Sequence, residues 1–148
     1  MKKPQVKLID KNNLFNLGFL NVIFFFFFTF SLNAKWEKVT QGLNGQDFYI
    51  DTEKIQESEN YVYFWQLINY LQPDEYGDLS ARIFIEADCK NFSFRWLYLA
   101  YHKEAMAADH AKVAQASKIV SNWQNPYSKS TSKAVLEHAC NYLNRNHE

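Results

Sequence analysis

Hydrophobic and polar residues alternate along much of the chain after residue 35, and this period of two is typical of β-strands. Two short runs, 36–41 and 46–50, lie on either side of Gly42-Leu43-Asn44-Gly45 and predict a first hairpin. Residues 51–55 then predict a single helical or 3₁₀ turn, with Asp51 as its cap.

A longer β-prone run covers residues 60–72, and both of its faces are apolar, so it predicts a central strand that is covered on each side. The composition of residues 73–78 predicts a loop. Strand alternation resumes over 79–89 and continues over 92–102, with Lys90-Asn91 as a tight turn. A two-residue turn places Glu86 opposite Arg95, which offers a cross-strand ion pair.

The last third of the sequence has a less regular pattern. Residues 104–118 contain several alanines, and the local pattern alone favours a helix there. Residues 123–128 predict a turn, and Ser130 or Thr131 is a suitable cap for a closing helix over 133–144. On this helix Cys140 belongs to the apolar face, so we expect it to point toward the sheet.

A basic and then apolar segment precedes these elements. Four lysines lie within residues 1–11, and an apolar stretch over residues 17–32 leads to the small residue Ala34. This order predicts a secretory signal peptide over residues 1–34 and an exported domain over residues 35–148, in the periplasm or outside the cell. The alternative is an uncleaved membrane anchor, although the stretch falls short of the roughly 18 residues that a spanning helix needs. After cleavage we expect no membrane attachment, because no cysteine near Ala34 can carry an acyl chain.

Removal of the signal changes the charge and the aromatic content that matter for folding. Residues 35–148 contain twelve basic and fifteen acidic residues, a net charge of −3, which argues against nucleic acid as a partner. Eighteen aromatic residues remain, enough for one aromatic-rich core in one domain.

Two cysteines, Cys89 and Cys140, lie in the exported part, where disulfides form and persist. Two cysteines allow a single intramolecular pairing, which closes a loop of about 50 residues and stabilises the fold by on the order of 4 kcal/mol. Two free buried thiols and an intermolecular bond are the alternatives.

The sequence shows no catalytic constellation. The four histidines are spread along the chain, and the serines at 128, 130 and 132 lie in a cap-rich segment without the turn that a serine nucleophile requires. We therefore expect no catalytic residue, no metal ligand and no cofactor. Glu86 and Asp88 with Arg95 are either a small polar binding site or an ordinary surface ion pair.

The surplus of aromatic residues has two interpretations. If these side chains are not all covered by the helix, one sheet face is an apolar patch suited to a partner or a flat ligand; otherwise they build the core. The candidate binding aromatics are Tyr61, Tyr63, Trp65, Trp96 and Tyr98.

The order and spacing of several elements resemble the surface-adhesin protein E family of exported bacterial domains. The matching residues are Trp36, Tyr49-Ile50-Asp51, Trp65 and Leu67, Glu86-Ala87-Asp88-Cys89, Arg95, Tyr101 with Met106, residues 123–126 and Cys140. The family often has a glycine shortly after the methionine and Pro-Gly-Ser before the helix, where this chain has Ala108-Asp109 and Pro126-Tyr127-Ser128.

The resemblance implies an α+β fold in which an antiparallel sheet of about six strands curves over one C-terminal helix. It implies a Cys89–Cys140 disulfide between helix and sheet, and it makes residues 106–118 a hairpin in place of the helix. Its best-known member resembles a lipid-anchored adhesin for host matrix and plasma proteins, and this chain lacks the anchoring cysteine.

Taken together, the sequence predicts an exported, non-enzymatic binding module with a protein partner, which fits an exposed sheet face or edge strand. One alternative is capture of a small ligand or haem on the aromatic face, which requires a pocket of several hundred Å³ lined by tyrosine and tryptophan. The other is a hydrolase, which requires a histidine and an acid that converge in a cleft, and the spacing gives no reason to expect this.

Overall fold

The structure is a computed structural model that describes residues 35–146, so the predicted signal peptide lies outside the described residues. The elements, in chain order, are β1 (Trp36–Gln41), β2 (Asp47–Asp51), the 3₁₀ turn η1 (Thr52–Lys54), β3 (Gln56–Ser58), β4 (Tyr61–Asn69), β5 (Ser80–Asp88), β6 (Ser93–His102), the 3₁₀ turn η2 (Ala105–Ala107), β7 (Ala114–Gln115) and the helix α2 (Thr131–Asn146). Within this range, no helix is both long and apolar enough to cross a bilayer.

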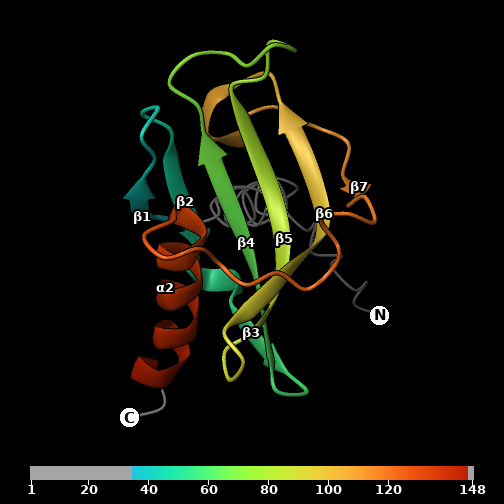
Figure 1. Cartoon of the computed structure of the whole chain (residues 1–148). Helices are drawn as coiled ribbons and strands as arrows, with labels where there is room; N and C mark the ends of the chain where they lie inside the picture. The colour runs from blue at the N-terminus through green and yellow to red at the C-terminus, as the bar shows by residue number, and fades with distance from the viewer. Residues whose placement is uncertain (1–34, 147–148) are drawn as a thin grey trace, which may run out of the picture. The chain divides into compact units, whose positions relative to one another are not determined.

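The described strands form one antiparallel sheet in the order β1-β2-β4-β5-β6-β7, and the short β3 pairs with the other end of β4 (Figure 1). The helix α2 packs against β1, β2 and β4. This arrangement confirms the predicted α+β fold with an antiparallel sheet and a C-terminal helix. It also confirms β4 as a central strand, because β2 and β5 flank it. The predicted cover on both faces is only partly right, because α2 packs on one face and Tyr61, Tyr63 and Trp65 on the other are only half-buried.

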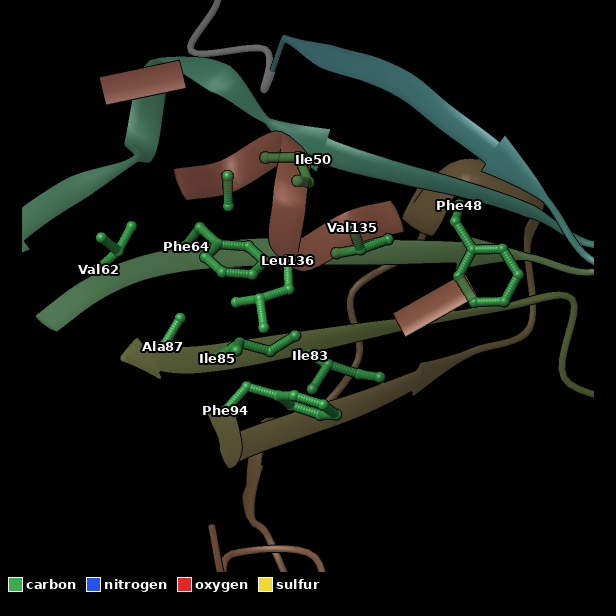
Figure 2. Close-up of a cluster of buried hydrophobic side chains, with 11 residues drawn as sticks. Phe48, Ile50, Val62, Phe64, Ile83, Ile85, Ala87, Phe94, Val135 and Leu136 are labelled. Carbon is green, nitrogen blue, oxygen red and sulfur yellow. The ribbon is translucent and has the colours of Figure 1, made fainter. Parts of the chain in front are cut away.

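The hydrophobic core lies between the sheet and α2. Alternate residues of β4, including Val62 and Phe64, point toward the helix, and Val135 and Leu136 reach them from α2 (Figure 2). Full burial of a side chain of this size stabilises the fold by roughly 1.5–3 kcal/mol. The core also contains Phe48, Ile50, Ile83, Ile85, Ala87, Phe94 and Ala139.

Polar caps fix the ends of the short elements. The Asp51 carboxylate accepts a hydrogen bond from the Glu53 N–H at 3.3 Å, as predicted for the 3₁₀ turn. The Ser130 hydroxyl accepts from the Lys133 N–H at 3.1 Å, so Ser130 is the cap at the start of α2. Between β5 and β6, the Asp88 carboxylate accepts from the N–H groups of Lys90 and Asn91 and holds the turn.

A disulfide joins the sheet to the helix. Cys89, just after β5, is bonded to Cys140 in α2, with 5.7 Å between their Cα atoms. Both half-cystines pack against the hydrophobic core. The pairing that the family resemblance implied is therefore confirmed.

The helix favoured by the local pattern of residues 104–118 is wrong. The chain makes only the 3₁₀ turn η2 and then returns along β6, where β7 pairs with Tyr98 and Leu99. Residues 106–118 contribute one short strand that pairs with β6, and not the hairpin of their own that the family resemblance implied. The backbone hydrogen bonds that the segment makes with the edge of β6 outweigh the weak helix propensity of a few alanines.

Strand β3 and the end of β4 also differ from the prediction. Residues 56–58 are all polar and exposed, so they carry no apolar signal, yet they pair with β4 through a turn at Glu59 and Asn60, whose φ angles are 52° and 72°. Positive φ at both central residues is typical of the tight turns that suit strand twist. The predicted run 60–72 ends as a strand at Asn69.

Candidate functional site

The sheet face opposite α2 carries most of the predicted site residues. On β4 the side chains that alternate with the core positions are Tyr61, Tyr63 and Trp65, and all three are only half-buried. We use the term aromatic face for these three residues together with their neighbours on this side: Arg82, Phe84, Glu86, Arg95, Tyr98 and Trp123.

Phe84 is at the centre of a group of four rings on this face. Its ring centroid lies 6.2 Å from that of Tyr63, 5.0 Å from that of Trp65 and 6.4 Å from that of Tyr98. The four residues come from three neighbouring strands, β4, β5 and β6. Because cross-strand aromatic pairs stabilise a sheet and hold each other in place, these rings form a firm apolar surface.

A buried carboxylate organises the charged part of the aromatic face. Glu86, only 4% exposed, accepts a hydrogen bond from the Tyr63 hydroxyl at 2.9 Å and pairs with Arg95 on the next strand. The predicted register of Glu86 opposite Arg95 is confirmed. The hydrogen bond to Glu86 raises the pKa of Arg95, while burial and then the Glu86 carboxylate raise the pKa of Tyr63.

Trp123 adds to this charged part, although it was not among the candidate binding residues. The Arg95 guanidinium lies over the Trp123 ring at 4.8 Å from its centroid, and the Tyr61 ring lies 5.4 Å away on a tilted contact. The backbone of Gln124 pairs with that of Phe94, which places this segment beside β6. The local pattern predicted a turn over residues 123–128 but not its contact with the sheet.

Trp96 lies on the opposite face of the sheet from the other candidate aromatics. It borders a cavity of about 60 Å³ between the sheet and α2, beside Val135 and Leu136. The reason is a bulge: Ile85 pairs with Trp96 but its neighbour Phe84 pairs with Tyr98, which leaves Leu97 as an extra residue. Trp96 therefore belongs to the core side, whereas Tyr98 belongs to the aromatic face.

The larger clefts lie away from the ring group. A cleft of about 520 Å³ separates the β1–β2 hairpin from the start of α2, and its lining includes Gln41, Ser130 and Lys133. Another, of about 450 Å³, lies beside the β3–β4 turn and reaches Tyr61. Neither of them is lined by tyrosine and tryptophan together, which is the lining that a haem-type pocket was expected to have.

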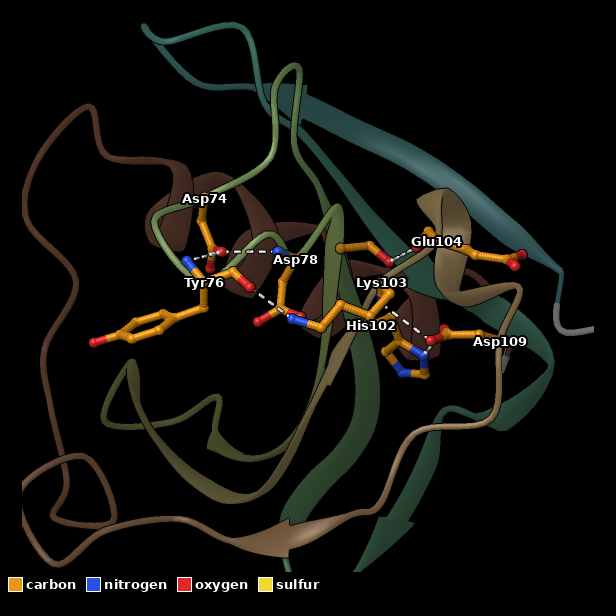
Figure 3. Close-up of polar contacts among 8 residues, drawn as sticks. Asp74, Tyr76, Asp78, His102, Lys103, Glu104 and Asp109 are labelled. Atoms are coloured by element: carbon orange, nitrogen blue, oxygen red, sulfur yellow. Dashed lines mark hydrogen bonds and ion pairs between the residues drawn. The ribbon is translucent and has the colours of Figure 1, made fainter.

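A second polar cluster holds two loops at the far end of the sheet (Figure 3). The Asp74 carboxylate accepts hydrogen bonds from the N–H groups of Tyr76 and Asp78, at 2.9 and 2.8 Å. Lys103 donates to the Tyr76 carbonyl at 2.7 Å and pairs with the Asp78 carboxylate at 2.8 Å. These contacts bind the β4–β5 loop to the end of β6.

The same cluster contains a histidine and an acid whose proximity was not predicted from the sequence. The Nδ1 atom of His102 lies 2.7 Å from Oδ1 of Asp109, whose other oxygen accepts from the Lys103 N–H (Figure 3). Burial raises the pKa of Asp109, the hydrogen bonds from His102 and Lys103 lower it, and the net shift is downward. The return of the chain after β6 is what brings residue 109 back to residue 102.

Ser80 pairs with His102 across β5 and β6, so serine, histidine and acid lie close together. The Ser80 hydroxyl nevertheless donates to the Glu104 carbonyl and accepts from the Ala107 N–H, and the side chain is fully buried. His102 is 2% exposed. Both side chains are thus buried, and their contacts fix the loop over residues 103–109 against the start of β5.

A further histidine, His138, joins the helix to the sheet. His138 on α2 lies 3.3 Å from the Glu37 carboxylate on β1, which links the helix to the edge strand. Within residues 35–146, no three histidine, cysteine, aspartate or glutamate side chains gather in a way that could hold a metal ion.

Comparisons with known proteins agree with the fold. Two solved structures of Haemophilus influenzae protein E are similar to this chain. One has a TM-score of 0.55 and 18% identity, and the match covers 75% of this chain and 91% of that chain. The other, from a non-typeable strain, has a TM-score of 0.52 and 16% identity, and the match covers 76% of this chain and 79% of that chain. At this identity the similarity shows the fold alone. A search of curated proteins finds no match. The sequence profile of surface-adhesin protein E matches residues 36–141, and the chain therefore belongs to the surface-adhesin protein E family.

Proposed function

We propose that this protein is an exported, non-enzymatic module that binds a protein partner through its aromatic face. Membership of a surface-adhesin family supports export and a role in adhesion. In this proposal residues 1–34 direct export, and residues 35–148 are the mature binding domain.

The observation that carries the proposal is the exposure of aromatic side chains beside rings that are already held in place. Tyr98 is 44% exposed and Trp123 is 40% exposed. The Tyr98 ring contacts that of Phe84, and the Trp123 ring contacts that of Tyr61. Tyrosine, tryptophan and arginine are the residues enriched at the centres of protein interfaces, because they bury much area at a low entropic cost. A flat face of this composition, opposite the packed helix, suits a protein surface better than an enclosed small ligand.

The test is binding of the exported full-length gene product to a panel of purified extracellular-matrix and plasma glycoproteins, measured by biolayer interferometry. Tyr98→Ala and Trp123→Ala are expected to weaken binding by about tenfold or more, which is typical of interface aromatics. Tyr127→Ala is the matched control, because Tyr127 is exposed but is not part of the aromatic face.

Thermal unfolding of each variant separates binding from folding. Both truncated side chains are partly exposed and lie outside the hydrophobic core, so we expect the midpoints to stay close to that of the parent protein. Equal binding by parent, Tyr98→Ala and Trp123→Ala would contradict the proposed use of this face. Loss of binding in Tyr127→Ala alone would move the contact to another surface.

A further inference from the structure

The aromatic face contains two arginine–tryptophan pairs that differ in one respect. Arg82 lies over the Trp65 ring at 4.6 Å from its centroid, and Arg95 lies over the Trp123 ring at 4.8 Å. Arg95 has the buried Glu86 carboxylate as its partner. Among the residues that the structure describes, no carboxylate forms an ion pair with Arg82 and no group accepts a hydrogen bond from it.

The surroundings of Arg82 make an unpaired charge there unfavourable. Its cross-strand neighbours on β4 and β6 are Leu67 and Ala100, which are apolar and buried, and its Nε atom is buried without an acceptor in the described part of the chain. A guanidinium next to apolar groups interacts with an anion more strongly than one in bulk water does. The nearest acid along β5, Glu86, is already occupied by Arg95.

We infer that Arg82, stacked on Trp65, is the receptor for a carboxylate of the protein partner, an aspartate or glutamate side chain within an otherwise apolar segment. This inference rests on the proposed function and specifies the chemistry of its partner. Because Nε is buried, the incoming carboxylate reaches the guanidinium at its two terminal nitrogens, in the paired geometry that arginine favours. Trp65 holds the guanidinium plane, and Phe84 and Tyr98 supply the apolar surface beside it.

A sulfated polysaccharide or another polyanion fits less well. The domain over residues 35–148 has a net charge of −3, which repels a polyanion at long range. A polyanion also gains affinity from several free cations, and on this face Arg95 is already neutralised by Glu86. A single carboxylate needs only the one free guanidinium.

The experiment selects binders of the exported full-length gene product from a displayed library of random 12-residue peptides. Peptides enriched by the parent protein are expected to contain aspartate or glutamate next to apolar residues. Synthetic copies of the best of these, with the acid or with its amide, are then titrated while tryptophan fluorescence is followed. The amide copy and the Arg82→Gln variant are each expected to weaken binding by about tenfold or more, since each removes the hydrogen bonds between two charged groups.

Arg82→Lys and Lys112→Gln are the controls. The first keeps the charge but loses the paired geometry, so we expect an intermediate affinity. The second removes the same charge at an exposed residue that is not among those of the aromatic face, so this variant should bind like the parent. A selection without acidic residues, or equal binding by Arg82→Gln, overturns the inference. If Tyr98→Ala still abolishes binding in that case, the proposed function stands without it. Tighter, Arg82-dependent binding of a heparin fragment would also overturn it, in favour of a polyanion.

Discussion

Removal of the disulfide tests how much of the stability of this small domain depends on one covalent link. Cys89 and Cys140 are 51 residues apart in the sequence, so the bond closes a loop that contains β6, β7 and the start of α2. In the chain-entropy model, opening a loop of this length costs about 4 kcal/mol of stability at 25 °C. Since small domains have net stabilities of about 5–15 kcal/mol, this is a large share of the total.

The assay is urea unfolding of the double variant Cys89→Ala/Cys140→Ala beside the parent protein, both as exported full-length gene products. With a urea dependence of about 1.5–2 kcal/mol per molar for a domain of this size, we expect the midpoint to fall by roughly 2–3 M. The unfolding slope should increase, because the unlinked chain exposes more surface when it unfolds. A midpoint shift below about 0.5 M would refute the reasoning.

Hydrogen exchange shows through which state the disulfide acts. If the bond mainly restricts the unfolded chain, amides of α2 and of the central strand β5 lose protection by the same amount in the double variant. If it mainly holds α2 against the sheet, amides of α2 lose more. We expect the first result, because Val135 and Leu136 anchor the helix to the core independently of the bond.

Three further outcomes follow from single contacts. Leu136→Ala should lower the free energy of unfolding by about 2–5 kcal/mol in urea titrations, because it empties the fully buried centre of the helix–sheet core. Arg95→Met should cost about 2 kcal/mol, because Glu86 is left buried with only the Tyr63 hydroxyl, and the additional change Glu86→Gln should restore part of this; no recovery in the double variant would contradict the pairing. The turn hydrogen bonds from Asn91, and then that from Lys90, lower the pKa of Asp88. Its contribution to stability is therefore present above about pH 4 and is lost as the pH falls through the folded pKa. Asp88→Asn should flatten the acid side of the plot of thermal midpoint against pH, and an unchanged slope would contradict this.

The elements that the sequence predicted correctly are those with a local and regular signal. Period-two alternation found β4, β5 and β6, and Asp51 and Ser130 marked the beginnings of the 3₁₀ turn and of α2. The register of Glu86 opposite Arg95 followed from a two-residue turn alone. Prediction failed where the structure depends on contacts between residues that are distant in the sequence. The alanines of 104–118 favoured a helix, but pairing with the edge of β6 prevented it.

The candidate site was predicted only in part, for a similar reason. Tyr61, Tyr63 and Trp65 share one face because β4 is regular over those residues. Arg82 and Phe84 could have been added, since they alternate with Glu86 along β5. The contact of Trp123 with Arg95 and that of Asp109 with His102 depend on where an irregular segment returns, and no local pattern encodes that.

The bulge at Leu97 shows how one residue decides what the aromatic face contains. Without it, Trp96 and Tyr98 would lie on the same face of the sheet. With it, Trp96 packs against the core beside Val135 and Leu136, while Tyr98 stacks on Phe84 and stays exposed. The same bulge therefore places Trp96 in the core and leaves Tyr98 exposed for the proposed binding, so a deletion of Leu97 is expected to damage both sides of the sheet. The core and the proposed binding surface both depend on this one feature of β6.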